Sequence, residues 1–257
     1  ENITLDNSAV AAVDKAAYKL FNHYKDMGGN TYSGLRGEVS RTYAGLFKEA
    51  EGNAKITVAT VGGMAKNYAS FKANISLDKI TDSKSLKAIL SADIKIVKSL
   101  ANIIARTPAG AERNNLATQL LNIVMVSSLK QAEFAASEEV KSIAKDFAEY
   151  QVEYAEALNK AFTDVKNAGV DLQQIVKNDV FIRKISGKDV NVFKESMKSL
   201  GSSMASSLKG DNLKKASTAL NSINKMFGIE SAPAVLYMMA APAPPLDGIE
   251  GITPTQK

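Results

Sequence analysis

Residues 82–108 read DSKSLKAILSADIKIVKSLANIIARTP, and this stretch decides the fold class. Asp82 stands where a helix N-cap belongs, since a short polar side chain accepts hydrogen bonds from the first free amides of a helix. Apolar residues then recur every three or four positions, which is typical of a helix with one face in a core. Pro108 closes the stretch because proline disfavours helical backbone in the residue before it. The pattern predicts one long amphipathic helix.

The same apolar repeat continues along most of the chain. Aspartates precede several of these segments and glycines follow them, as expected at the two ends of a helix. We predict helices over residues 5–27, 33–51, 54–72, 82–107, 110–134, 137–165, 171–186, 189–209 and 211–227, the one that begins at 137 being the longest. The connections between them are short, which favours antiparallel neighbours. The sequence therefore predicts an all-α fold, a multi-helix bundle of about eight or nine helices.

One of these segments carries mixed signals. Residues 56–61 read ITVATV, and their β-branched side chains favour a strand, while Gly62 and Gly63 follow as helix breakers. The neighbouring segments are helical and no partner strand is visible. We therefore interpret residues 54–72 as a helix that can kink at the two glycines.

Length and composition fit a folded protein rather than a disordered one. The chain has 257 residues, of which 45% are hydrophobic and 23% are charged, as in ordinary globular domains. We expect a helical bundle domain over 1–239, either undivided or made of two subdomains, about 1–107 and 108–239. The prolines after residue 240 are incompatible with a helix, so residues 240–257 are expected to form a flexible, extended tail.

The chain lacks most of the side chains from which active sites are commonly built. The chain has no cysteine and one histidine, His23, so thiolate and histidine-rich metal sites are excluded. Asp146, Glu149, Glu153 and Glu156 fall on the polar side of the predicted long helix and indicate a solvated acidic face. Four Ser-x-x-Lys pairs lack the companion motifs of serine enzymes. We expect no enzymatic activity, no cofactor and no metal.

Charge is distributed unevenly along the chain, whose net charge is +5. Residues 133–164 hold eight acidic and three basic residues, whereas 166–225 hold eleven basic and five acidic ones, and 55–106 hold nine basic and three acidic ones. Two interpretations stay open: these segments neutralise one another within the bundle, or the basic ones form a face that attracts anionic glycans or lipid head groups. The candidate polyanion-binding residues are Lys177, Arg183, Lys184, Lys188, Lys194, Lys198, Lys214 and Lys215. Nucleic acid is disfavoured because the aromatic residues fall mostly on core-facing stripes.

Two further features favour an extracellular or cell-surface location. The sequence holds two N-glycosylation motifs, at Asn2 and Asn74, which have meaning only in a secreted protein. It begins with Glu1 rather than methionine and without a signal peptide, which we interpret as a processed form. No apolar run approaches the length of about 18 residues that a transmembrane helix needs.

A helical domain of this size that is poor in cysteine and tryptophan and runs into a Pro/Ala-rich spacer, Ala240–Pro245, resembles a known class of parasite coat protein. The chain is similar to the lipid-anchored merozoite surface antigens of piroplasms such as Babesia. The resemblance covers architecture and composition, so it assigns no binding residue. It implies adhesion to host erythrocytes and a glycosylphosphatidylinositol anchor beyond the C-terminus, through which alone the protein would contact a membrane.

The function expected on these grounds is a non-enzymatic secreted or cell-surface protein that binds a host-cell or polyanionic surface. An intracellular or luminal helical scaffold is one alternative. A helical lipid carrier is another, since methionines such as Met197 and Met204 would suit an adaptable apolar site.

Overall fold

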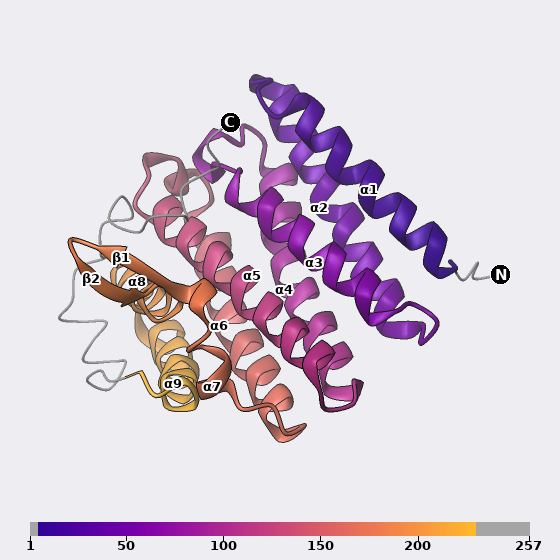
Figure 1. The fold of residues 1–257 in the computed structure, drawn as a ribbon. Helices are drawn as coiled ribbons and strands as arrows, with labels where there is room; N and C mark the ends of the chain where they lie inside the picture. Colours follow the sequence, from indigo (N-terminus) through magenta and orange to yellow (C-terminus); the bar gives the residue numbers. More distant parts are fainter. Residues whose placement is uncertain (1–4, 230–257) are drawn as a thin grey trace.

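The computed structural model describes residues 5–229, which fold as an all-α bundle (Figure 1). This described part contains nine α-helices and one two-stranded hairpin, which confirms the predicted fold class and number of helices. The helices are α1 (Asn7–Tyr24), α2 (Gly29–Gly52), α3 (Val58–Ala73), α4 (Ser83–Arg106), α5 (Ala111–Ala135), α6 (Ala144–Asn167), α7 (Leu172–Ile175), α8 (Val192–Ser207) and α9 (Gly210–Phe227). The strands are β1 (Ile182–Ile185) and β2 (Lys188–Asn191).

The long helices are arranged in two layers. From α2 onward, each long helix packs most closely against the next long helix but one, while α1 packs equally on α2 and α3. Helices α1, α3, α5 and α8 thus form one layer, and α2, α4, α6 and α9 form the other. Figure 1 shows the resulting stack, which begins at α1 and ends at α8 and α9. Stacked helix pairs of this kind contact mainly their neighbours and present long outer faces to solvent.

A single set of buried apolar side chains runs through the whole stack. Aromatic rings hold its last part together: Phe227 lies 4.9 Å from Phe162 and 4.7 Å from Phe193, measured between ring centroids. Helices on both sides of residue 108 contribute to this core, because α3 packs on α5 and α4 packs on α6.

The predicted capping residues are confirmed at several helix ends. The Asp6 side chain accepts a hydrogen bond of 2.7 Å from the backbone amide of Ala9, and Asp82 accepts one of 2.7 Å from Ser85. Gly228 ends α9 with a φ of 64°, a left-handed conformation that glycine adopts without steric cost.

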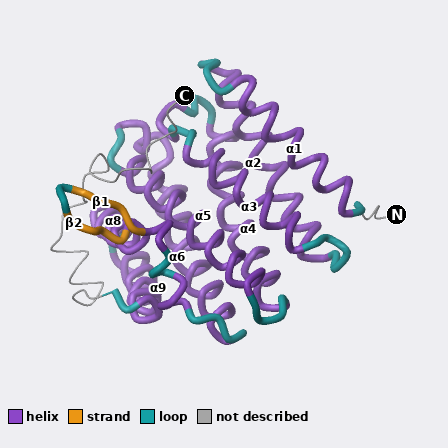
Figure 2. Tube along the Cα trace, viewed as in Figure 1, coloured by secondary structure: helices purple, strands orange, loops and turns teal. Residues whose placement is uncertain are grey.

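The predicted helix over 171–186 is wrong. The structure places the one-turn helix α7 there, then a 3-10 turn and the β1–β2 hairpin, in which Ile185 pairs with Lys188 (Figure 2). Ser186 and Gly187 both have positive φ, 52° and 80°, as a tight two-residue hairpin turn requires. The predicted helix depended on Asp171 as a helix start and Gly187 as a helix stop, whereas the β-branched residues beside the turn favour strands.

Several other predicted boundaries also change. Helix α2 begins at Gly29 rather than at residue 33. The long helix expected from residue 137 is interrupted, since Glu138–Ile143 form a 3-10 helix before α6 begins. Helix α3 begins only at Val58, where Thr57 caps it, and it continues through both glycines as one helix. Helix α8 begins at Val192 rather than at 189, because Asn191 is its N-cap and accepts a hydrogen bond from the amide of Lys194.

The predicted tail, 240–257, and the Pro/Ala-rich spacer lie outside the described residues, as does Asn2. None of the helices in residues 5–229 is both long enough and apolar enough to cross a membrane.

Candidate functional site

The predicted polyanion-binding residues lie at one end of the stack. They belong to the segment after α7, to the β1–β2 hairpin, to α8 and to α9, which Figure 1 shows close together at the end opposite α1. The exposed members are Lys177, Lys184, Lys188, Lys214 and Lys215, whereas Arg183, Lys194 and Lys198 are half-buried. The structure therefore brings the eight residues to one region of the molecule, which we call the basic end.

Three of these eight cations are engaged within the protein. Arg183 donates hydrogen bonds to two backbone carbonyls, at 2.7 and 3.1 Å. Lys184 forms an ion pair of 3.1 Å with Asp189 across the hairpin, and Lys198 forms one of 3.4 Å with Glu195. The other five make no ion pair with a described residue and leave their charge to solvent: Lys177, Lys188, Lys194, Lys214 and Lys215.

The other residues that the sequence singled out lie apart from the basic end. Asn74 is half-buried at the C-terminus of α3, where its side-chain amide donates a hydrogen bond of 2.7 Å to the Ser70 carbonyl. His23 is exposed near the end of α1, with its ring 4.6 Å from that of Tyr24.

The acidic residues of α6 form the solvated face that the sequence predicted. Asp146, Glu149, Glu153 and Glu156 are all exposed, and Asp146 pairs with Lys87 of α4 at 3.0 Å. Within residues 5–229, no three acidic or histidine side chains come close enough together to hold a metal ion.

Sequence reasoning missed a groove between α2 and α4. Its volume is about 750 Å³, and small side chains such as Ala44, Ala88 and Ala92 line it. The cations at its edge are Arg41, Lys48, Lys95 and Lys98, and Glu51 is the acidic residue of the lining. A signal was present in the sequence, since small and basic residues alternate on the polar side of residues 84–102. We call this feature the α2/α4 groove.

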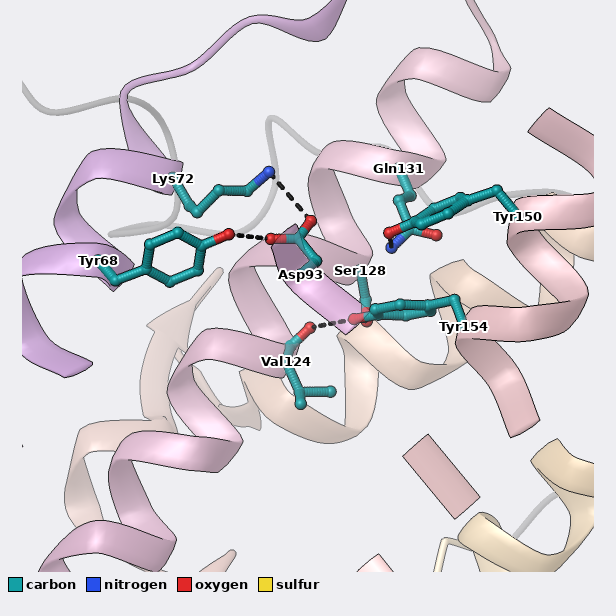
Figure 3. A network of polar contacts seen from close by, with 8 residues as sticks. All are labelled: Tyr68, Lys72, Asp93, Val124, Ser128, Gln131, Tyr150 and Tyr154. Carbon is teal, nitrogen blue, oxygen red and sulfur yellow. Dashed lines mark hydrogen bonds and ion pairs between the residues drawn. The ribbon is translucent and has the colours of Figure 1, made fainter. Parts of the chain in front are cut away.

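A network of polar side chains lies inside the bundle between α3 and α6 (Figure 3). Tyr68 and Lys72 of α3 both reach Asp93 of α4: the Tyr68 hydroxyl donates a hydrogen bond to Asp93 Oδ1, and Lys72 Nζ lies 3.1 Å from Asp93 Oδ2. The side chains of Lys72 and Asp93 are 0% and 1% exposed. Among described atoms, neither Lys72 Nζ nor Asp93 Oδ2 has a hydrogen-bond partner beyond this ion pair. This ion pair is fully removed from water.

Tyrosines of α6 extend the network on the other side of Asp93. The Tyr154 hydroxyl lies 3.1 Å from Ser128 Oγ of α5, and Gln131 donates a hydrogen bond of 3.2 Å to the Tyr150 hydroxyl (Figure 3). Burial, and then the negative charge of Asp93, raise the pKa of Tyr68 and of Tyr150 well above the ordinary value. Phenols whose pKa is raised in this way keep their protons, so the network is better suited to hold α3, α4, α5 and α6 in register than to transfer protons.

A buried amine of α5 gives a pH-dependent signature of this core. The side chain of Lys130 is 3% exposed. The pKa of Lys130 is lowered from 10.5 to about 8, chiefly by burial; the negative charge of Glu133 opposes this shift and the positive charge of Lys72 adds to it. The folded protein therefore releases this proton at a lower pH than the unfolded chain does.

We expect the free energy of unfolding to rise between about pH 8 and about pH 10, because the unfolded state then holds the Lys130 proton that the folded state has released. Lowering the pKa from 10.5 to about 8 corresponds to at most about 3 kcal/mol. Above about pH 10 the trend reverses, since buried Tyr68 and Tyr150 keep protons that unfolded tyrosines lose.

Urea unfolding at a series of pH values measures this effect. In Lys130→Met the rise between about pH 8 and about pH 10 should disappear, and the variant should be more stable than the parent near pH 7. An unchanged rise in Lys130→Met would contradict the assignment.

Together these features define a two-layer stack of helix pairs with a polar core network, a basic end and a cationic groove. Comparison with protein families, with curated proteins and with solved structures found no match for this chain.

Proposed function

We propose that this chain is a non-enzymatic binding protein that adheres to a polyanionic surface through its basic end. The observation that supports this most is the set of five cations at that end without an ion pair to a described residue. Residues 166–225, which build this end, hold eleven basic and five acidic residues. Unneutralised charge concentrated in one region attracts anionic partners over about 10 Å at moderate ionic strength.

The partner that we propose is an anionic glycan or the head groups of a host-cell surface. The exposed lysines suit sulfate, carboxylate or phosphate groups, which a flexible ammonium contacts as a point charge. The protein would work outside the cell or on its surface. The resemblance to lipid-anchored surface antigens and the two glycosylation motifs support that location.

Retention on immobilised heparin at increasing salt tests this proposal. Wild-type protein should be retained at low ionic strength and released as salt screens the contact. The variant Lys177→Glu/Lys188→Glu/Lys214→Glu/Lys215→Glu should bind at least about tenfold more weakly, since each reversed charge removes up to about 1 kcal/mol of attraction and adds repulsion.

Lys15→Glu/Lys19→Glu is the control for nonspecific attraction, because both lysines are exposed on α1 at the other end of the stack. It should keep most of the retention. Absence of wild-type retention at low salt would overturn the proposal, and equal loss in the control would show attraction by net charge alone. Loss confined to Lys48→Glu/Lys95→Glu would move the binding site to the α2/α4 groove.

A further inference from the structure

The outer face of the layer formed by α2, α4, α6 and α9 carries two adjoining hollows of opposite character. The first is the α2/α4 groove, with its four cations. The second has a volume of about 570 Å³ and lies between α4, α6 and α9, and Glu149, Glu153 and Glu156 line it together with Lys160 and Asn212. Lys98 lines both hollows, so they meet along α4.

Five charges of this face stay unpaired within the described part of the chain, whereas Arg41 and Lys48 at the groove edge pair with Glu38 and Glu51 of their own helix, α2. The exposed lysines Lys95 and Lys98 of α4 and the three glutamates of α6 make no ion pair with any residue in the described range, although α4 and α6 are packed together. Lys87 of α4 and Asp146 of α6, by contrast, do form an ion pair between these two helices. The face thus holds a basic strip, formed by Lys95 and Lys98 with Lys48 of α2 beside them, and next to it an acidic strip, formed by Glu149, Glu153 and Glu156. The five unpaired residues of α4 and α6 remain available to a partner.

The two strips stand at the same height along the helices. Lys87 near the start of α4 pairs with Asp146 near the start of α6, and further along Lys98 shares a hollow with Glu156. Helices α4 and α6 therefore run in the same direction in register. On the other side of α4, residues 41–51 of α2 line the groove opposite residues 88–102.

This layout is self-complementary under twofold rotation. The twofold axis is parallel to the helices and lies in the face, between the basic and the acidic strip. Rotation about this axis exchanges the two sides of the face and keeps each residue at the same position along the helix direction. A second copy rotated in this way sets its acidic strip against the first copy's basic strip, and the same contact forms a second time. We propose that a second copy of this chain docks on this face, with α6 of each copy seated in the α2/α4 groove of the other.

The shape and size of the groove fit a helix of a second copy. Its small side chains leave room for a ridge, and a side chain added at Gly45 would meet no atom within 4 Å. The wall formed by residues 88–102 is about 21 Å long at 1.5 Å per residue, and three helices spaced about 9 Å apart span about 20 Å. A face of this size is at the lower end for specific interfaces, so the dimer is weak and salt-sensitive.

Sedimentation velocity of the full chain tests the proposal. Wild-type protein should show a concentration-dependent dimer at about 0.01 M salt that dissociates at about 1 M, as the Debye length falls from about 30 to about 3 Å. Lys48→Glu/Lys95→Glu reverses the groove, and Glu153→Lys/Glu156→Lys reverses the acidic strip. Each variant alone should be monomeric, because like charges then meet at both contacts.

The decisive result is the mixture of the two variants. Lys48→Glu/Lys95→Glu carries acidic groups on both strips, and Glu153→Lys/Glu156→Lys carries basic groups on both. An equimolar mixture of the two variants should therefore form a heterodimer about as strong as the wild-type dimer. Lys15→Glu/Lys19→Glu, on the opposite layer, makes the same change of net charge as the groove variant and should still dimerise. Circular dichroism confirms that each variant is folded.

A second measurement uses unmodified protein. A carbodiimide that joins contacting amines and carboxylates should link Lys48 or Lys95 to Glu153 or Glu156 between isotopically distinct copies, as seen by mass spectrometry. A monomeric wild type at low salt, a dimer that persists in either reversed variant, or a mixture that stays monomeric would each overturn the proposal. Capture of an acidic helical peptide by a monomeric wild type would assign the groove to another protein instead. None of these outcomes depends on heparin retention.

Discussion

Asp93→Asn is expected to lower the free energy of unfolding by about 3–5 kcal/mol, the effect of leaving one partner of a buried ion pair without its counter-charge. Asparagine has nearly the shape of aspartate and still accepts a hydrogen bond from Tyr68. The substitution therefore removes chiefly the charge that Lys72 Nζ contacts at 3.1 Å. Because the Lys72 side chain is 0% exposed, water cannot replace the lost partner.

The double variant Lys72→Met/Asp93→Asn is the matched control. It removes both charges and fills the space of the lysine stem with an apolar chain, so its stability should return to within about 1.5 kcal/mol of the parent. Urea unfolding of the parent, the two single variants and the double variant gives the coupling energy. A single-variant loss below about 1 kcal/mol would show that water or another group reaches Lys72.

Phe162→Ala should lower the free energy of unfolding by about 3–5 kcal/mol, through lost burial and the cavity that remains. Phe162 of α6 is fully buried, and its ring packs edge-on against Phe227 of α9 at 4.9 Å and against Phe193 of α8 at 6.4 Å. The ring thus joins the two layers at the end of the stack that carries the basic residues.

Phe162→Leu provides the graded comparison, because it keeps much of the buried volume and should cost clearly less than the alanine variant. Hydrogen exchange should show the loss of protection concentrated in α6, α8 and α9, since stacked helix pairs pass strain mainly to their neighbours. Equal destabilisation by leucine and alanine would contradict the packing argument. A loss of protection spread evenly to α1 would show that the stack unfolds as one unit.

Most of the helical fold could be predicted from local signals. The segment that became α4 has strong apolar periodicity over more than six turns, and Asp82 and Gly228 mark helix ends where the structure has them. The β1–β2 hairpin could not be recovered from that periodicity. Over ten residues, apolar positions spaced for a hairpin also match a helix, and only the Ser186-Gly187 turn tells the two apart.

The candidate sites were only partly predictable. The uneven charge of the sequence predicts the cations of the basic end, but the partners of Lys184 and Lys198 depend on which carboxylates lie within 4 Å in the fold. The α2/α4 groove is formed by two helices whose facing residues lie about forty to fifty positions apart in the chain. The sequence does not show that three charged residues, Lys72, Asp93 and Lys130, are buried. Each one stands beside apolar neighbours in an otherwise ordinary helix.

Helix periodicity, capping side chains and helix-ending glycines act within a few residues, so the amino-acid order alone determined the helical class, most helix ends and the charge of each segment. The layer order did not follow from such local signals. Placing α4 between α2 and α6 sets Lys95 beside an open groove, and packing this layer against the layer that contains α3 sets Asp93 against Lys72 away from water. Only the tertiary structure decided these outcomes, because the free energy of a charge depends on the groups and the water around it in space.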